Sequence, residues 1–584
     1  MYFSKIYGRR GSILLASLLV GTSILGAADD ATTAAANSTT TGTSAVQSQN
    51  EEIARLQAAL AAQQKQLEAL QKSMEQQQKL LEKAMDTTNA QQTQRPNLGN
   101  VASLSPMVPG PSPSAVAIPS LASPRPQAAP AAAGGNPCEA GAEGNTVPPY
   151  LRLGSVCIVP IGFMDLTSVW RDKNAGSSMG SNYGSVPYNN TTNGNLSEFR
   201  FTPQNSRLGL RVDGDWKGVH FIGYNEFDFN GTSGSNGITV NNGAFVPRLR
   251  LFWVDVRKDK IEFLAGQSWS MLTPNRKGIS ALPGDLFYSQ VIDINYVAGL
   301  TWTRQPGMRV LYHPNDKVTF GFSAEQPDQY MGGSAGGSSI VLPSTYSALA
   351  GTQLDNAQNI GSGNTVLGAP TVAPDLIAKI AFDPNSKVHL ELGGIERTFK
   401  TVNPSLLTQH FTATGGGVLL GANVEVLPGV RLISTNFWSD GGGRYLFGQA
   451  PDLIVRGDGT LSLVHSGGTV DGIEATIRNT LLYGYYGADY IGRDSAYAAD
   501  GKTLVGYGYT GSANSQNRVI NELTFGFNQT MWKNPRYGAI NFMGQYEWLQ
   551  RDPWFVALGS PKATHDNTIY VNVRYTLPGS MPNF

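Results

Sequence analysis

The segment IYVNVRYTL, residues 569–577, carries the pattern that decides the fold of this chain of 584 residues. Apolar side chains from Ile569 to Leu577 alternate with polar ones, among them Asn572 and Arg574, so the two kinds lie on opposite faces of an extended strand. A half-buried strand of a soluble protein would look the same in isolation. The fold is therefore decided by how often this pattern recurs.

Segments of about ten residues with alternating apolar and polar side chains recur from residue 156 onward. Short turns alternate with long polar or Gly-rich connections between these segments. We expect short turns around Asp213–Lys217, Lys258–Lys260, Pro314–Lys317, Pro384–Lys387, Leu427–Gly429, Arg478–Asn479 and Lys533–Arg536. The long connections lie at about 172–205, 231–247, 268–303, 326–374, 396–411, 439–467, 492–517 and 552–566. Seven turns and eight connections join sixteen strands, and an even number places both ends of a transmembrane barrel on the short-turn, periplasmic side. Strands within 412–477 are poorly defined, so eighteen is the alternative count.

The composition excludes several competing classes of protein. Lys and Arg number 43, as do Asp and Glu, and only 15% of residues are charged, against about 25% in typical soluble domains. This balance removes the electrostatic argument for a nucleic-acid partner. Beyond the N-terminus there is no run of about 18 apolar residues, which excludes a helical membrane protein. We therefore expect an all-β fold, a transmembrane antiparallel β-barrel over residues 155–584.

The N-terminus has the form of a secretory signal peptide over residues 1–28. Lys5, Arg9 and Arg10 precede an apolar stretch, and small residues at Gly26–Ala28 supply a cleavage site. The alternative is a membrane anchor, for which the apolar stretch is short. Export takes the chain out of the cytoplasm, and the predicted barrel then places it in the outer membrane, with its N-terminal region in the periplasm. Residues 29–50 are rich in Ala, Thr and Ser and are expected to be disordered.

Residues 51–86 carry a heptad pattern. Apolar residues occupy most a and d positions, at Ile53, Leu56, Leu60, Leu67, Leu70, Met74, Leu81 and Ala84. About five heptads predict a coiled coil, and the uncharged Gln at the e positions favours association of identical chains. Large apolar a positions with Gln at two d positions favour three strands over two. The alternative is a single amphipathic helix packed on another surface. A Pro/Ala-rich linker follows over residues 87–154.

Cys138 and Cys157 are the two cysteines of the chain. An even number in an exported protein predicts a disulfide, which would join the end of the linker to the first strand. Two unpaired thiols are the alternative.

Charged residues in the first strands indicate which face lines the lumen. Arg207 and Arg211 alternate with leucines, and the next strand places Glu226 and Asp228 on one face. A water-filled lumen tolerates such charges, whereas an Arg facing mid-membrane lipid would cost about 2–4 kcal/mol. The alternative is a salt-bridge ladder on a soluble sandwich. Trp residues near strand ends suggest belts at the membrane interfaces, at Trp216, Trp253, Trp302, Trp438, Trp532 and Trp548.

The third long connection, loop three, is expected to set the constriction of a pore. Its charges would create a transverse field, with Arg276 and Lys277 on one side and Asp285 and Asp293 on the other. Two more cations follow at Arg304 and Arg309. The alternative is an ordinary exposed loop whose charges are solvated.

Several motifs resemble those of the DcaP-like trimeric outer-membrane porins, notably their acidobacterial members. They are Phe201–Gly209 (FTPQNSRLG), Arg248–Trp253 (RLRLFW) and Ala265–Trp269 (AGQSW). The order of signal, coiled coil, Pro-rich spacer and barrel is also similar. The resemblance implies a homotrimer of sixteen-stranded barrels with bundled coiled coils, and passive uptake of small solutes, including small anions such as dicarboxylates. The sequence departs at its end, where Pro578 and Pro582 separate the terminal Phe584 from the last strand.

The sequence thus predicts an outer-membrane porin through which small hydrophilic solutes diffuse. The alternative is a structural protein whose barrel, held in the outer-membrane lipid, anchors a periplasmic coiled coil to the peptidoglycan. No nucleotide-binding loop or HExxH motif is present, so we expect neither an enzyme nor a cofactor, and no Cys, His and carboxylate spacing predicts a metal site. The sequence does not identify the solute or the ion selectivity.

Overall fold

The structure, a computed structural model, describes residues 150–175, 179–181, 183–231, 245–282, 296–333, 339–355, 371–534 and 536–578. The predicted signal peptide, disordered segment and coiled coil, and all of the linker before residue 150, lie outside these residues. So do Asp285 and Asp293, and the terminal Phe584. None of the helices in the described ranges is long and apolar enough to cross a membrane.

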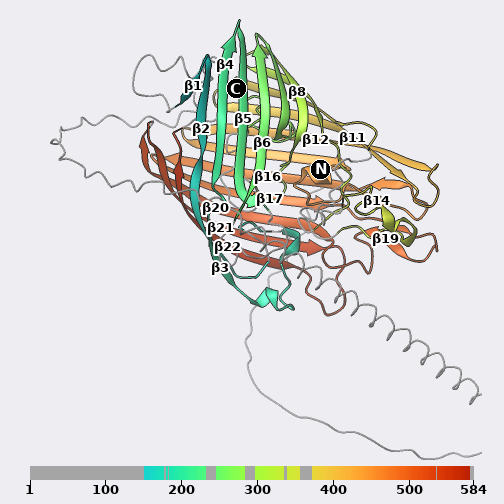
Figure 1. Cartoon of the computed structure of the whole chain (residues 1–584). Helices are drawn as coiled ribbons and strands as arrows, with labels where there is room; N and C mark the ends of the chain where they lie inside the picture. The colour runs from blue at the N-terminus through green and yellow to red at the C-terminus, as the bar shows by residue number, and fades with distance from the viewer. Residues whose placement is uncertain are drawn as a thin grey trace, which may run out of the picture. The chain divides into compact units, whose positions relative to one another are not determined.

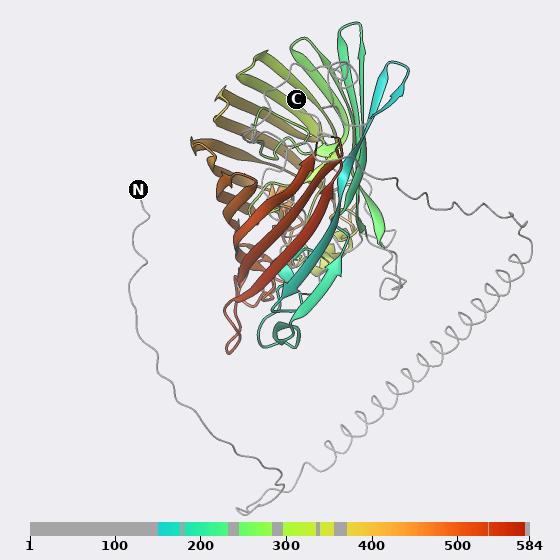
Figure 2. The ribbon, with the colours of Figure 1, turned by 90° about the vertical axis from the view of Figure 1, so that its left-hand side faces the viewer.

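Sixteen antiparallel strands form a closed barrel wall within the described residues (Figures 1 and 2). They are β2 (Val156–Arg171), β3 with β4 (Glu198–Thr202 and Arg207–Trp216), β5 (Val219–Gly231), β6 (Val246–Lys258), β7 (Ile261–Trp269), β8 (Arg304–Asn315), β9 (Val318–Glu325), β10 (Asp375–Asn385), β11 (Val388–Val402), β12 (His410–Leu427), β13 (Val430–Asp440), β16 (His465–Ile477), β17 (Thr480–Ile491), β20 (Asn517–Asn534), β21 (Gly538–Pro553) and β22 (Thr564–Thr576).

Two details of the pairing settle the strand count. Both β3 and β4 pair with β2, one above the other, so they form a single wall strand interrupted at residues 203–206. The short β1 (Leu151–Leu153) only extends the first hairpin. The barrel closes where β2 pairs with β22, from Phe163 opposite Thr576 to Arg171 opposite Thr568. The predicted count of sixteen is therefore confirmed over the alternative of eighteen.

The turns and connections follow the predicted order. All seven short turns lie where expected, and three contain a non-glycine residue with positive φ: Lys217 (50°), Asp259 (52°) and Arg478 (55°). Such left-handed backbone lets two strands reverse direction over two residues. All eight long connections occur at the opposite end. Several are shorter than expected, most clearly the one predicted at 396–411, because β11 continues to Val402 and β12 begins at His410.

The two faces of the wall have the predicted composition. On β4, Leu208 and Leu210 point outward and are about two-fifths exposed, whereas Arg207 and Arg211 point inward and are buried. On β22, Ile569, Val571 and Val573 are exposed while Tyr570 and Asn572 are buried, as the alternation from Ile569 onward predicts. The period of two therefore separates outside from inside all along the wall.

Two of the predicted belt tryptophans are instead inside the barrel. Trp253 points inward from β6 and stacks on Tyr224 with ring centroids 5.1 Å apart. Trp302 belongs to loop three and packs on Trp269 at 3.8 Å. Because side chains alternate between the two faces of a strand, Trp253 lies on the inner face together with Leu251. Its position near a strand end does not indicate which face it occupies. Trp216, Trp438 and Trp532 are exposed on the outside as predicted, and Trp548 is partly exposed.

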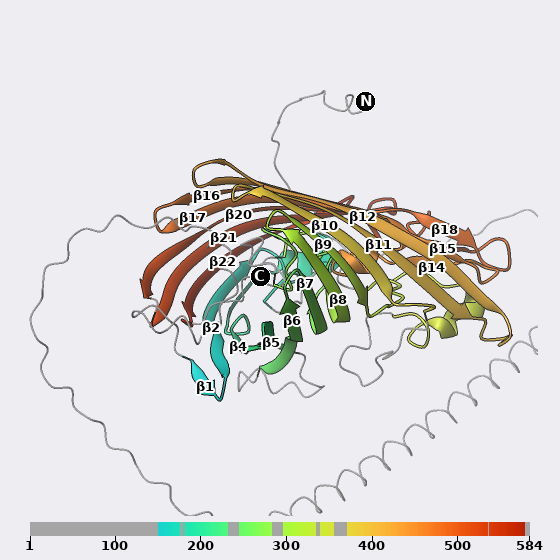
Figure 3. The ribbon, with the colours of Figure 1, turned by 90° about the horizontal axis from the view of Figure 1, so that it is seen from above.

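Long connections fold into and over the barrel rather than extending into solvent. The hairpins β14–β15 (Leu453–Val455, Leu461–Leu463) and β18–β19 (Asp494–Tyr497, Leu504–Tyr507) gather at one end of the wall, beyond the long β11 and β12 (Figure 3). They pack with loop 326–374 in one apolar cluster that includes Tyr346, Ile454 and Tyr507. Described residues of three long connections therefore pack together at the long-loop end of the barrel.

Candidate pore constriction

The inward charges of β4, β5 and β6 form one connected network. Glu226 accepts hydrogen bonds from Arg250 (Nε to Oε1, 2.6 Å), and Arg207 lies 3.7 Å from the same carboxylate. Asp228 is bound by Arg250 (Nη1 to Oδ2, 2.8 Å) and Arg248 (Nη2 to Oδ2, 2.5 Å). Of the two arginines predicted to face these carboxylates, Arg207 does so, next to Glu226. Sequence reasoning missed Arg250, which is fully buried between the two carboxylates.

Arg211 occupies a separate position nearer the short-turn end. Its Nη2 donates to Asp213 Oδ1 at 2.6 Å on the same strand, and His220 Nδ1 lies 2.9 Å from Asp215 Oδ1. Arg211 is thus neutralised by its neighbour two positions away, and not by Glu226 or Asp228.

Loop three crosses the lumen and is fixed to the far wall. Arg276 makes a two-pronged ion pair with Glu474 on β16, with Nη1–Oε2 at 2.9 Å and Nη2–Oε1 at 2.6 Å. The Tyr485 hydroxyl donates to the same carboxylate at 2.8 Å. The backbone N–H of Gly278 donates to Asp383 Oδ2 on β10 at 3.0 Å. The expectation that loop three is folded into the barrel agrees with these contacts.

A buried ion pair holds the first part of loop three. Lys379 Nζ on β10 lies 2.8 Å from Glu391 Oε2 on β11 and donates to the Thr273 carbonyl at 2.9 Å. Glu391 in turn accepts from the backbone N–H of Asn275 at 3.2 Å. Because Lys379 and Glu391 are both buried, each requires the other and the loop to satisfy it. The pair was not foreseen, because the strand boundaries around 375–402 are needed to see that both side chains face inward.

The second part of loop three is clamped through Glu522 on β20. This carboxylate accepts from the backbone N–H of Ala298 (2.8 Å) and from the hydroxyl of Tyr183 in the first long connection (3.0 Å). Burial raises the pKa of Tyr183 well above its usual range, so the hydroxyl keeps the proton that it donates. One carboxylate therefore joins two inserted connections to the wall.

The inner surface is less polar than a simple water-filled lumen. Tyr296, Val297, Leu300 and Trp302 of loop three pack against inward apolar residues of several wall strands, such as Ile222 on β5. Loop three is therefore held to the wall by apolar packing as well as by the polar contacts of Arg276 and Gly278. Burial of this apolar area supplies much of the free energy that keeps the loop inside.

The remaining predicted constriction residues divide into three groups. Arg309 is buried and donates from Nη2 to Ser268 Oγ at 3.0 Å, and the Arg304 guanidinium lies 5.1 Å from the centre of the Trp269 ring, so both position the start of loop three. Lys277 is exposed and forms no ion pair with any described residue. Asp285 and Asp293 lie outside the described residues, so the transverse field remains a prediction.

Cys157 is fully buried on β2 and disulfide-bonded. Cys138 lies outside the described residues, and its pairing with Cys157 remains a prediction. Among the residues that the structure describes, no three His, Cys, Asp or Glu side chains are placed to hold a metal ion.

No protein-family model matches the chain, and no curated protein matches it in sequence. Solved structures do match. The outer membrane channel DcaP of Acinetobacter baumannii is 17% identical, with 74% of this chain and 99% of that chain covered at a TM-score of 0.51. An anion-selective porin from Comamonas acidovorans is 13% identical (72% and 99% covered, TM-score 0.39), and Salmonella typhi OmpF in complex with daunomycin is 9% identical (73% and 100%, 0.40). The first similarity shows that this chain has the fold of the DcaP channel.

Proposed function

We propose that this barrel, which has the fold of the DcaP channel, is an outer-membrane porin through which small hydrophilic solutes diffuse passively. The observation that carries the proposal is loop three, which crosses the inside of a closed sixteen-stranded barrel and is fixed to the far wall through Arg276 and Glu474. A loop held across the lumen narrows the path without closing the barrel wall, and the charges at the narrowest ring decide which ions pass.

We further propose a preference for small anions such as dicarboxylates. The inward arginines at positions 207, 211 and 250 are each paired with carboxylates, and the cluster of Arg207, Arg248 and Arg250 with Glu226 and Asp228 holds one cation more than anions. Lys277 differs from them because it is exposed and has no ion-pair partner among the described residues. An unpaired ammonium beside the path attracts anions and repels cations.

The test is to measure currents through the purified protein in a planar bilayer. We expect discrete conductance steps, and a reversal potential in a salt gradient that indicates anion preference. A unit charge about 7 Å from a passing ion in water changes the energy of that ion by about 0.6 kcal/mol. After screening by salt, Lys277→Ala should therefore lower the anion-to-cation permeability ratio about threefold. Lys217→Ala, at an exposed short turn, is the control and should leave the ratio unchanged.

The second candidate is a structural protein that anchors the periplasmic coiled coil to the cell wall. The apolar cluster around Tyr346 and Tyr507 favours it, because long connections packed together at one end of a barrel can obstruct the path through it. The two candidates differ in conductance. A correctly folded barrel that gives no channel steps would exclude the porin and leave the anchor. Conductance steps whose anion-to-cation permeability ratio is unchanged in Lys277→Ala would exclude only the proposed anion preference.

We also propose that the native assembly is a homotrimer joined by the coiled coil of residues 51–86 in the periplasm. The heptad pattern and its uncharged e positions support this assembly.

A further inference from the structure

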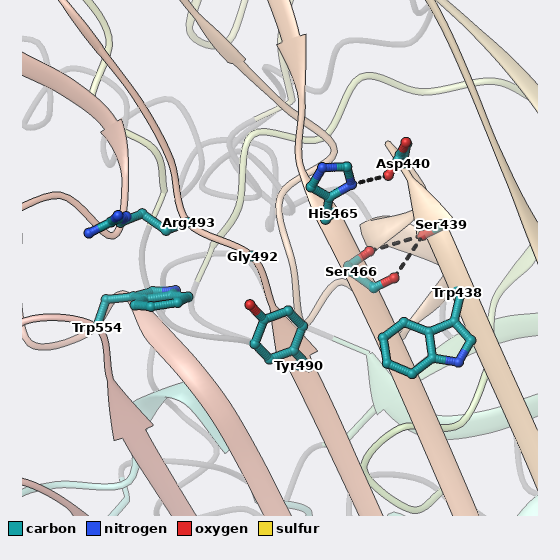
Figure 4. A pocket seen from close by; sticks show the side chains of 9 residues that line it. All are labelled: Trp438, Ser439, Asp440, His465, Ser466, Tyr490, Gly492, Arg493 and Trp554. Atoms are coloured by element: carbon teal, nitrogen blue, oxygen red, sulfur yellow. Dashed lines mark hydrogen bonds and ion pairs between the residues drawn. The ribbon is translucent and has the colours of Figure 1, made fainter. Parts of the chain in front are cut away.

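A pocket opens at the long-loop end of the barrel wall, and we call it the rim pocket. It has a volume of about 570 Å³ and lies between the ends of β13, β16 and β17 and the connection that follows β21 (Figure 4). Three aromatic side chains from different elements line it: Trp438, Tyr490 and Trp554. Arg493 lies beside Trp554, and the ion pair of His465 with Asp440 lies at another side of the pocket.

The hollow has a local cause in the sequence. Trp438 on β13 lies opposite Gly467 on β16, and Gly467 lies opposite Tyr490 on β17. The three positions form one row on the outer face of the wall, and the middle one has no side chain. A Cβ at Gly467 would lie 2.6 Å from Cε3 of the Trp438 ring, so the indole lies over the space that the glycine leaves. The row is therefore a recess between two aromatic side chains.

The rim pocket lies at the height of the membrane interface on the long-loop, outer side. Tyr490 is ten residues above Thr480, where β17 begins beside a short turn. Ten residues at about 3.4 Å each, tilted by about 40°, rise about 26 Å, and the apolar band of such barrels is about 25 Å tall. Tyr490 and Trp438 are therefore at the upper edge of this band, where aromatic side chains meet lipid headgroups.

Two arginines lie beside the pocket without a counter-ion. Arg493 follows β17 and Arg518 is on β20, and their guanidinium carbons lie 5.8 and 5.9 Å from the centre of the Trp554 ring. Both residues are exposed, and neither forms an ion pair with any residue that the structure describes. Two like charges beside one ring repel each other, and an anion that binds next to them removes this cost.

The carboxylates of this region do not neutralise the two arginines. Asp440 is paired with His465. Asp494 directly follows Arg493, and Asp552 lies two residues before Trp554, but neither carboxylate is within ion-pair distance of Arg493 or Arg518. Asp552 Oδ1 instead accepts a hydrogen bond from Gln550 Nε2 at 2.9 Å. The two guanidinium groups are therefore available to an anion from outside the chain.

We propose that the rim pocket binds the phosphorylated headgroup of a lipid in the outer leaflet. Guanidinium groups bind phosphate through two parallel hydrogen bonds, and Arg493 and Arg518 supply them at the level of the headgroups. The volume of the pocket is within the range of about 300–1,000 Å³ that holds small ligands, and the aromatic recess gives the body of the headgroup a surface to pack on.

The wall below the arginines favours a lipid over a soluble phosphate compound. On the neighbouring strands β20 and β21, Leu523 lies opposite Trp548, and Phe525 lies opposite Tyr546. These side chains face outward and form an apolar surface on which acyl chains pack. A soluble anion would use the arginines but would gain nothing from this surface, so the arrangement as a whole fits a phosphate joined to hydrocarbon chains.

The inference rests on the proposed position of the barrel in the outer membrane and not on its conducting solutes, so its test does not use conductance. The full-length protein is purified in detergent and freed of bound lipid. It is then titrated with lipid A, a glucosamine disaccharide lipid that carries two phosphates, and bound lipid is counted by native mass spectrometry. The comparison lipid is the same molecule with both phosphates removed.

We expect the phosphorylated lipid to bind more tightly than the dephosphorylated one. Arg493→Ala with Arg518→Ala should weaken binding of the phosphorylated lipid about tenfold, as expected for the loss of two exposed ion pairs, and should not affect the dephosphorylated lipid. The matched control is Arg456→Ala with Lys502→Ala, which removes two exposed cations from long connections at the same end of the barrel and should leave binding unchanged.

Gly467→Leu tests the recess without changing any charge. The leucine side chain would occupy the space under Trp438, so binding of the phosphorylated lipid should weaken several-fold while the barrel still migrates as a folded species in unheated gel samples. Unchanged binding in this folded variant would show that the recess is not part of the site and would overturn the assignment to the rim pocket.

Two further results would overturn the inference. Equal binding of the two lipids, or unchanged binding in the double arginine variant, would show that no phosphate is recognised here. Displacement of lipid A by excess inorganic phosphate would show that the arginines take a free anion and that the apolar wall contributes nothing. A purified barrel that binds the phosphorylated lipid but gives no channel steps would refute the porin proposal and leave this inference standing.

Discussion

Removing the Arg276 guanidinium tests whether loop three is held across the lumen by its contact with Glu474. In Arg276→Ala the buried Glu474 keeps one hydrogen bond among the described residues, from the Tyr485 hydroxyl on β17 at 2.8 Å. Breaking one partner out of a buried pair costs about 3–5 kcal/mol. The Arg276 side chain is 21% exposed and that of Glu474 is 5%, so we reduce the estimate to about 2 kcal/mol for solvent screening.

A loss of about 2 kcal/mol raises the fraction of time that this part of the loop is detached about 30-fold. The loop should not leave the barrel, because Lys379 and the N–H of Gly278 still hold it to β10 and Asp383. We therefore expect single-channel recordings of Arg276→Ala to show more open-channel noise and more frequent changes of conductance level, with normal barrel stability. Arg276→Lys, which keeps the charge and loses the two-pronged geometry, should be intermediate.

The double variant Arg276→Ala with Glu474→Gln gives the decisive comparison. If the two side chains act as a pair, adding Glu474→Gln to Arg276→Ala should not increase the open-channel noise further. It should partly reduce that noise, because no unpaired buried carboxylate remains. Arg536→Ala, at a short turn, is the control. Unchanged currents in Arg276→Ala, or fully additive effects in the double variant, would show that this pair does not hold the loop.

Three further predictions concern other parts of the molecule. Gly299→Ala should displace loop three, because φ of Gly299 is +89° and an added Cβ would lie 2.4 Å from the Ala488 carbonyl oxygen. Proteolysis of the loop should therefore become faster, and an unchanged rate of proteolysis would contradict this packing. Burial, only partly offset by Arg397, raises the pKa of Asp452 from 3.8 to about 6. The folded form thus favours the protonated acid, so the stability from this group is full below about pH 4 and is lost as the pH rises through about 6. The rate of proteolytic cleavage of loop 441–464 is compared between the unsubstituted protein and Asp452→Asn. The two rates should be equal near pH 4, and the unsubstituted protein should be cleaved faster at about pH 7.5. A ratio of the two rates that does not depend on pH would exclude the effect. Deleting residues 51–86 should shorten the lifetime of trimers in detergent, and trimers of unchanged lifetime would mean that contacts between barrels suffice.

The sequence determined the barrel because strand periodicity and turn chemistry are local properties. The alternation from Ile569 onward fixes which face of β22 is apolar, and the short turns around Lys217, Asp259 and Arg478 fix where the chain reverses. Counting turns against long connections then gives sixteen strands and both ends of the barrel on one side. None of these steps depends on residues that are distant along the chain.

Only the tertiary structure decided what the charges do. Arg276 was expected to line a constriction, but it pairs with Glu474, which is 198 residues away, while its neighbour Lys277 stays exposed. Trp253 and Trp302 turn into the barrel, where loop three buries them. Periodicity says that a side chain faces inward, but whether it meets water, a counter-ion or an inserted loop depends on which segments the closed sheet brings opposite each other. That arrangement is a long-range property, and it separates the charges that balance one another from those left to act on a passing ion.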